Sequence, residues 1–301
     1  MAAVDTIPAS HASQTPPARA VAVRSRAVRS TGWHLFMLLA LVALLFPLAW
    51  LVSASFKSSG EIFTTTSFWP QEFTPANWTD ALDGAGGLTF WQLLANSLIL
   101  STLTVIGNVA SCALAGYALA RMRFRLRGPF FAFTIVTLML PMHVVLIPQY
   151  IIFQQLGLIG TFLPLVLPKF LATEGFFVFL VIQFVRGIPR ELDEAALVDG
   201  AGPYRTFFSV ILPLIRPALI TTAIFSFIWS WNDFFGQMIF LNKPETYTLQ
   251  LGLRLFIDQS STSSYGPMFA MSVLALLPIL LFFLVFQRYL VDGVATSGLK
   301  G

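Results

Sequence analysis

Long apolar runs separated by short polar segments are the main pattern along the chain. Six runs of about twenty residues or more hold few charged side chains: 33–53, 91–119, 129–152, 162–185, 217–240 and 267–287. A helix of about 20 apolar residues crosses the hydrocarbon core of a bilayer. The pattern therefore predicts an all-α membrane protein with six transmembrane helices. The run 91–119 is longer than a bilayer needs, so we expect it to tilt or to project at one end.

The composition agrees with this interpretation. Of the 301 residues, 56% are hydrophobic and only 11% are charged, whereas about 25% are charged in a soluble domain. Much of the surface must therefore face the lipid bilayer. The formal net charge of +4 is small, and the arginines flank the apolar runs instead of forming one patch, so we expect no nucleic-acid partner.

Residues 1–32 are rich in Ala, Pro, Ser and Arg and show no apolar period, which predicts a disordered tail. A targeting peptide is the alternative. Such a peptide places its apolar region soon after a short basic stretch and ends at a small-residue cleavage site. Here the apolar run begins only near Trp33 and is long enough to span, so we expect an uncleaved first helix.

The basic residues predict the orientation, because loops rich in Lys and Arg stay in the cytoplasm. Four arginines lie in each of the segments 1–32, 121–128 and 186–216, and Arg288 and Lys300 follow the last run. The alternate segments hold only Lys57, Lys243 and Arg254. This distribution places both termini and the segment 186–216 in the cytoplasm.

The two longer outer segments, 54–90 and 241–266, are long enough to meet a partner outside the membrane. For the first of them, Trp69, Trp78 and Trp91 offer another explanation, since tryptophan also anchors chains at the membrane interface. The sequence leaves both explanations open.

Signatures of an enzyme are absent from the sequence. There is no G-x-x-x-x-G-K-[ST] phosphate-binding loop and no G-x-S-x-G nucleophile motif. His11, His34 and His143 have no carboxylate or cysteine at ligand spacing, so we expect neither a metal nor another cofactor. Cys112 is the only cysteine and lies in an apolar run, which indicates a packing role.

The segment from Pro189 to Pro217 interrupts the apolar pattern with prolines, glycines and acids. Pro189 suits the first position of a helix, and Gly200 suits the left-handed position after a helix end. Pro203 is placed to begin a second helix, and Pro213 is placed to end or kink it. The segment therefore predicts two short helices with a turn between them.

Acidic residues of the first short helix indicate what the segment does. Glu191, Asp193 and Glu194 lie in its early turns, where the helix dipole favours acids. An amphipathic helix lying on the membrane is the alternative, but such a helix carries basic residues toward the headgroups. A protein partner in the cytoplasm explains the acids better.

This segment resembles the EAA loop of the membrane subunits of binding-protein-dependent ABC importers. That motif is E-A-A, three residues, G, nine residues and I-x-L-P. The chain has Glu194-Ala195-Ala196, then Gly200, then Val210, Leu212 and Pro213 at those spacings, with valine in place of isoleucine. The sequences SWND (230–233), LPIL (277–280) and the ending at 286–301 are similar to the carbohydrate-uptake branch, close to the maltose-type second permease.

The resemblance covers residues 33–301 and implies a type I ABC importer permease fold. The cytoplasmic tail (1–32) lies outside it. The rest of the chain is then a transmembrane permease domain (33–290) with a coupling loop (186–216), and a cytoplasmic C-terminal tail (291–301). The resemblance implies that the coupling loop docks on an ATPase dimer formed by other chains, so that this chain is a transport subunit and not an enzyme. The docking residues would be Glu194, Ala195, Ala196, Asp199 and Gly200.

Further partners follow from the same resemblance. They are a second permease subunit, an extracytoplasmic sugar-binding protein, the sugar itself and the lipid bilayer. The loop 243–266 would probe the sugar site of the binding protein. The resemblance places the chain in a bacterial inner (plasma) membrane, which it crosses several times. The C-terminal residues 293–301 would also reach toward the ATPases.

Polar residues within the apolar runs are candidates for the translocation path, because charges inside a span usually face a cavity or a partner. Glu174, Asn232 and Asp233 are such residues, and Trp229 adds an aromatic face suited to a sugar. Lys169 and Glu174 are five residues apart and should not share a helix face; Lys169 would alternatively reach the outer interface. For Asp233, the alternative is a structural role. For the sugar site, the alternative location is the partner permease.

Three other functions are alternatives to a sugar importer permease. The same kind of permease also carries non-sugar solutes such as glycerol phosphodiesters. An ion-coupled secondary transporter would use Glu174 and Asp233 as proton sites, but it predicts pseudo-symmetric halves, and the sequence shows no convincing internal repeat. A membrane scaffold without transport is the third.

Overall fold

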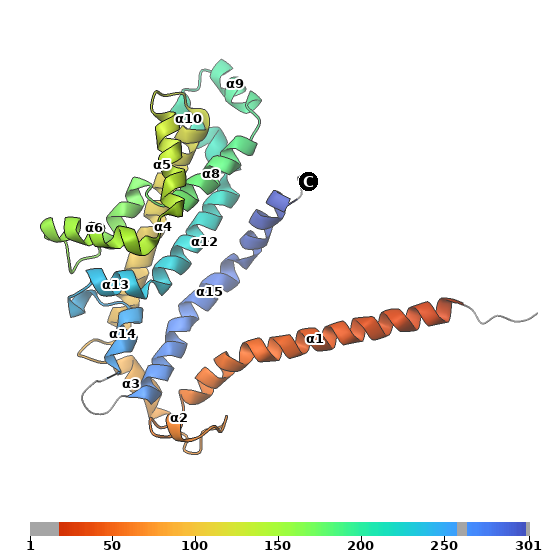
Figure 1. Cartoon of the computed structure of the whole chain (residues 1–301), viewed down its shortest axis with the longest axis vertical. Coiled ribbons are helices and arrows are strands. Elements are labelled where there is room, and N and C mark those ends of the chain that lie inside the picture. The colour runs from red at the N-terminus through yellow and green to blue at the C-terminus, as the bar shows by residue number, and fades with distance from the viewer. Residues whose placement is uncertain (1–17, 258–263, 299–301) are drawn as a thin grey trace, which may run out of the picture. The chain divides into compact units, whose positions relative to one another are not determined.

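The computed structural model describes residues 18–257 and 264–298, which form helices joined by turns and loops (Figure 1). The chain divides into two units, Met1–Leu51 and Val52–Gly301. The long helices are α1 (Ala18–Ala54), α4 (Phe90–Arg121), α8 (Gly175–Gly187), α12 (Arg216–Asn232) and α15 (Tyr265–Gly298). Within the described residues there is no β-strand, so the prediction of a helical protein is confirmed.

Helix α1 makes up the described part of the first unit. Its apolar stretch Gly32–Ala54 is long enough to cross a membrane. The helix begins at Ala18, so the expected disordered tail is corrected over residues 18–32. The segment after Pro17 is rich in alanine and arginine, both good helix formers, and contains no proline before residue 47. Residues 1–17 lie outside the described part of the chain.

Four to six segments of the described residues are long and apolar enough to span a membrane. Single candidate spans are Gly32–Ala54, Phe90–Arg121, Leu163–Gly187 and Tyr265–Gln287. Two further candidates are bent pairs: Arg127–Met139 with His143–Gln155, at 110°, and Pro203–Leu214 with Arg216–Asn232, at 75°.

The run 129–152 is therefore not one straight helix. It forms α5 (Arg127–Met139) and α6 (Met142–Gln155), with Pro141 in an extended conformation between them. The residue before a proline is biased away from the helical conformation, and Leu140 is indeed extended. The bend therefore has a local cause in the sequence.

Helix α4 is the centre of the second unit and packs against α12 and α8, while α15 packs against α12 and α3 (Ala76–Asp83). Gly116 allows α4 and α8 to approach closely, because a Cβ atom there would lie 2.5 Å from Cγ1 of Val181. The fully buried Cys112 belongs to the same apolar cluster, which confirms its packing role.

The second unit has two different ends (Figure 1). At one end lie α9 (Glu191–Val198) and α10 (Pro203–Thr206), and toward the other lie α3, α13 (Phe234–Phe240) and α14 (Leu249–Leu255). The remaining short elements are α2 (Glu61–Thr64), α7 (Leu163–Val166), α11 (Leu212–Leu214), a 3₁₀-helix η1 (Leu167–Leu171), a π-helical turn η2 (Phe207–Ile211) and a 3₁₀ turn η3 (Pro244–Thr246).

The segment 54–90 is held by buried polar groups. The Asn77 side-chain amide donates to the carbonyls of Ser55 (2.9 Å) and Lys57 (2.8 Å), and the buried Lys57 ammonium donates to the carbonyl of Ser67. Trp69 and Trp91 point away from the chain's own core and are exposed. Both membrane anchoring and contact with a partner remain consistent with that exposure.

Candidate functional site

The segment 186–216 folds as two short helices joined by a turn, as predicted. Helix α9 ends before Gly200, whose φ of +76° is the left-handed conformation that favours glycine. The Ala201 amide donates to the Ala196 carbonyl at 2.8 Å, which closes the turn. Pro203 occupies the first turn of α10 as expected, whereas α9 begins at Glu191, two residues after Pro189.

The second short helix continues through η2 into α11, which contains Pro213 and ends at Leu214. A 75° bend follows before α12. The prediction that Pro213 ends or kinks this helix is therefore confirmed.

Four of the five motif residues are accessible on this loop. Glu194, Ala195, Asp199 and Gly200 are exposed, whereas Ala196 is buried. The two alanines therefore do not form one open surface: Ala195 faces outward, and Ala196 packs against the chain.

The sequence did not point to four large apolar side chains that are exposed on this loop. They are 58–88% exposed: Leu197, Val198, Tyr204 and Phe208.

The C-terminal end of α4 contacts the coupling loop. Arg121 Nε and Asp193 Oδ2 are 3.3 Å apart and form an ion pair, and an Arg121 guanidinium N–H also donates to the carbonyl of Ile188. The Tyr117 hydroxyl donates to the carbonyl of Pro203 at 3.3 Å. Because 72 residues separate Arg121 from Asp193, local sequence spacing gave no signal for this pair.

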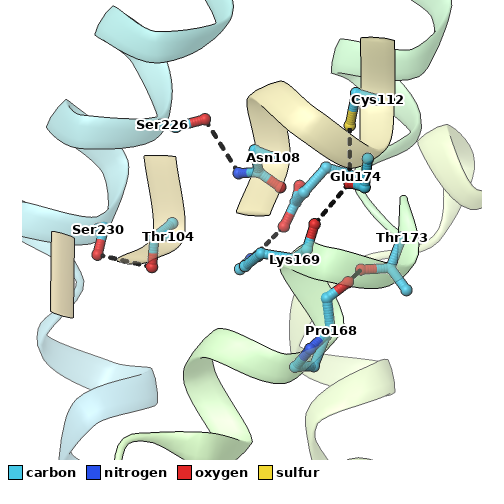
Figure 2. A network of polar contacts seen from close by, with 10 residues as sticks. Thr104, Asn108, Cys112, Pro168, Lys169, Thr173, Glu174, Ser226 and Ser230 are labelled. Atoms are coloured by element: carbon cyan, nitrogen blue, oxygen red, sulfur yellow. Dashed lines mark hydrogen bonds and ion pairs between the residues drawn. The ribbon is translucent and has the colours of Figure 1, made fainter. Parts of the chain in front are cut away.

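A second polar region lies where the apolar run 162–185 breaks (Figure 2). Helix η1 ends at Leu171, the next residue Ala172 has the left-handed φ of 52°, and α8 begins only at Gly175. The break brings the Lys169 ammonium onto the Glu174 carboxylate, and these two side chains form an ion pair. The expectation that they do not share a face assumed one regular helix and is wrong for that reason.

Helices α4 and α12 meet beside this ion pair through polar side chains (Figure 2). The Asn108 amide donates to Ser226 Oγ at 3.0 Å, and Ser230 Oγ donates to Thr104 Oγ1 at 3.4 Å. Asn108 is 2% exposed, and its Oδ1 atom has no partner among the described residues. Ser111 on α4 donates to the Lys169 carbonyl at 2.7 Å, which connects the polar contacts between α4 and α12 to the break before α8.

The run 217–240 is also broken. Helix α12 ends at Asn232, and Asp233 caps α13, since its carboxylate accepts the Gly236 amide at 2.9 Å. Asn232 is exposed, and its amide donates to the Ile228 carbonyl at 2.8 Å. The expected single helix over this run is corrected, because an aspartate that caps the next helix starts it with a non-helical backbone.

Trp229 connects the two breaks. Its ring centroid lies 5.1 Å from that of Phe177 and 5.7 Å from that of Phe176, both in the first turn of α8 after Glu174. Trp229 and Asn232 are exposed, whereas Asp233 is partly covered. The structure thus brings Trp229 to the start of α8, and it gives Asp233 a local structural role.

The chain was then compared with known proteins. Residues 107–296 match the family model described as "Binding-protein-dependent transport system inner membrane component". The chain belongs to this family. It is accordingly an inner membrane permease component of an ABC transporter.

Two curated permeases of this kind are similar over most of their length. The arabinooligosaccharides transport system permease protein AraQ of Halalkalibacterium halodurans is 33% identical, over 88% of this chain and 94% of that protein. The sn-glycerol-3-phosphate transport system permease protein UgpE of Agrobacterium fabrum is 30% identical, over 91% of this chain and 99% of that protein.

A solved structure shares the fold. It is a chain of a bacterial ABC transporter involved in the import of the acidic polysaccharide alginate, with a TM-score of 0.76 and 23% identity, over 88% of this chain and 98% of that chain. The fold of an ABC importer permease is therefore confirmed.

Proposed function

We propose that this permease is one membrane-spanning half of an ATP-driven, binding-protein-dependent importer for a sugar, either an oligosaccharide or a glycoside. The exposed EAA motif within the family match carries this proposal. The arabinooligosaccharide permease supports the sugar assignment. In this proposal a dimer of separate ATPase chains hydrolyses ATP, which agrees with a sequence that shows no phosphate-binding loop.

The coupling loop is the proposed ATPase contact. Glu194, Ala195, Asp199 and Gly200 form its outer surface, and Ala196 packs beneath them. The exposed Val198 extends this surface with an apolar side chain. Such a surface suits a cleft that combines basic and apolar groups, because opposite charges orient the contact and apolar burial stabilises it.

The orientation follows from the basic residues. The coupling loop, both termini and the tail 291–301 lie in the cytoplasm, and six spans connect them. The opposite end of the second unit, with α3, α13 and α14, then faces outward toward the extracytoplasmic sugar-binding protein. A second permease subunit completes the translocation path.

Glu174, Trp229, Asn232 and Asp233 are proposed to lie along that path. The supporting feature is the pair of breaks, at 172–174 and at 233, since interrupted helices in transporters commonly lie at the substrate site. Trp229 and Asn232 are the exposed pair and offer an aromatic face and a planar amide. Asp233 contributes by holding the second break open through its cap of α13.

One alternative cargo has a specific observation in its favour. The sn-glycerol-3-phosphate permease is 30% identical to this chain, so a glycerol phosphate ester is the second candidate solute. Ligand identification on the cognate binding protein distinguishes the two. We expect a sugar or glycoside to copurify or to raise the melting temperature of that protein, whereas a response to a glycerol phosphate ester alone, or to amino acids or metals alone, would overturn the sugar assignment.

A transport assay tests the importer itself. The complete complex is placed in liposomes. ATP is supplied on the side of the membrane that carries the coupling loop, and the loaded binding protein is supplied on the opposite side. We expect uptake only with ATP and the binding protein together. Uptake by this chain alone, driven by a proton or sodium gradient, would contradict the proposal.

A further inference from the structure

The end of α4 holds the coupling loop at three places along the chain. Arg121 donates to the Ile188 carbonyl before α9, its guanidinium pairs with Asp193 inside α9, and Tyr117 donates to the Pro203 carbonyl after the turn. These contacts therefore lie on both sides of the segment Glu194–Gly200, the first part of the motif.

The ion pair differs from the other charges of the loop in its burial. The Arg121 and Asp193 side chains are 8% and 24% exposed, whereas Glu191, Glu194 and Asp199 are exposed. An exposed pair contributes little, because water and salt screen it, but a shielded pair that loses one partner leaves an uncompensated charge. Asp193 is therefore directed inward to α4, while its acidic neighbours remain available to a partner.

The C-terminal end of α4 is stabilised by hydrogen bonds from α5. Arg127, at the start of α5, donates from Nε to the Leu119 carbonyl at 2.9 Å and from Nη2 to the Ala120 carbonyl at 3.2 Å. These bonds satisfy carbonyls that the last turn of a helix leaves free. Tyr117 and Arg121, which contact the loop, thus belong to a helix end whose carbonyl groups are hydrogen-bonded.

From this end, α4 leads directly into the polar centre of the bundle. Its Tyr117 ring packs on Phe207 with centroids 5.0 Å apart. About two turns toward the N-terminus of α4 from Tyr117, Asn108 contacts Ser226 of α12, and Ser111 contacts the Lys169 carbonyl at the break before α8. One rigid helix therefore joins the coupling loop to both elements of the proposed translocation path.

We infer that Arg121 and Tyr117 clasp the coupling loop to α4, so that a displacement of the loop moves α4 as one body with it. Arg121 is a positioning residue in this account: it does not touch the ATPase or the solute, and it acts through Asp193 and the Ile188 carbonyl. The inference rests on the proposed function, because it assumes that the loop receives the motion of an ATPase.

A purely structural role for the pair makes a different prediction. Loss of folding or assembly lowers ATP hydrolysis and solute uptake together and leaves their ratio unchanged. Without the contacts between α4 and the loop, the ATPases still hydrolyse ATP, but less of the displacement of the coupling loop is transmitted to α4. The number of ATP molecules hydrolysed per solute imported therefore separates the two roles.

The test compares Arg121→Gln, Asp193→Asn and the double variant in the complete importer in liposomes. We expect each single variant to raise the ATP hydrolysed per solute about fivefold or more, the lower range of coupling between linked sites. The double variant should be no worse than the more severe single variant, because both remove the same interaction. Arg125→Gln, an equal change of charge at an exposed residue four positions from Arg121, should leave the ratio unchanged.

An unchanged ratio in both single variants, or effects that multiply in the double variant, would overturn the clasp. If Arg121→Gln fails to assemble, Tyr117→Phe decides, since it removes only the hydroxyl and keeps the ring on Phe207: a raised ratio supports the clasp and an unchanged one overturns it. Failure of the proposed function is distinguished by the unmodified importer, which would then show no ATP-dependent uptake at all.

Discussion

Lys169 and Glu174 form an ion pair across the break between η1 and α8, although five residues of sequence separate them. The left-handed backbone at Ala172 turns the chain so that the second side chain meets the first. The pair is partly shielded, with side-chain exposures of 27% and 28%. It holds the two halves of an interrupted apolar segment in one arrangement.

Removing one partner of this pair should destabilise the protein more than removing both. We expect Glu174→Gln and Lys169→Gln each to lower stability by about 1–2 kcal/mol, between the values for exposed and buried pairs. The double variant should lose less than the sum, because no charge is left unpaired. Thermal unfolding of the purified chain in detergent measures this, and strictly additive losses would contradict the pairing.

The apolar runs located the spans, but they did not reveal where the spans break. Hydropathy averages over a window and is insensitive to backbone conformation, so 129–152, 162–185 and 217–240 each read as one helix. Pro141 was a visible signal for the first break. Ala172 offered none, since alanine is ordinarily a helix former.

The coupling loop was predictable in more detail because its structure is local. Gly200 permits the left-handed backbone after a helix end, Pro203 restricts φ at the start of the next helix, and both occupy the expected positions. Its attachment to α4 was not predictable, because Arg121 and Asp193 are brought together only by the packing of the whole bundle. The burial of Ala196 is missed for the same reason.

Close packing of α4 on α8 should depend on Gly116. A Cβ atom there would lie 2.5 Å from Val181 Cγ1, so we expect Gly116→Ala to lower stability by about 1–3 kcal/mol through overpacking. Val181→Ala in the same chain should recover part of that loss by making room. Gly128→Ala is the control, since nothing lies within 4 Å of the added atom. A melting temperature unchanged by Gly116→Ala would contradict the close approach.

Two substitutions of Asp233 separate a role as the cap of α13 from a role of its charge in the translocation path. If the cap of α13 is its function, Asp233→Asn keeps an oxygen acceptor and should behave nearly normally, whereas Asp233→Ala should lose about 1 kcal/mol of stability. If its charge acts in the path, both variants should lower solute uptake to the same extent. Uptake and thermal unfolding, measured on the same preparations, distinguish the outcomes.

Trp229 and Asn232 should affect the solute more than the fold, because both are exposed within this chain. We expect Asn232→Ala to raise the solute concentration needed for half-maximal uptake, while the free energy of unfolding stays within about 0.5 kcal/mol of the original, as for surface substitutions. Gln154→Ala, which also removes an exposed amide but on α6, is the control for loss of an exposed side chain. A fall in assembly with no change in half-maximal concentration would argue against a place in the path.

The central claim is that the surface from Glu194 to Gly200 receives the motion of an ATPase on another chain. Glu194→Lys combined with Gly200→Asp reverses a charge and adds a side chain on that surface, and Glu191→Lys is the control at an exposed acid outside the motif. In the complete importer, the double variant should lose ATPase copurification or ATP-driven uptake, and the control should retain both. Normal assembly and transport in the double variant would contradict the account.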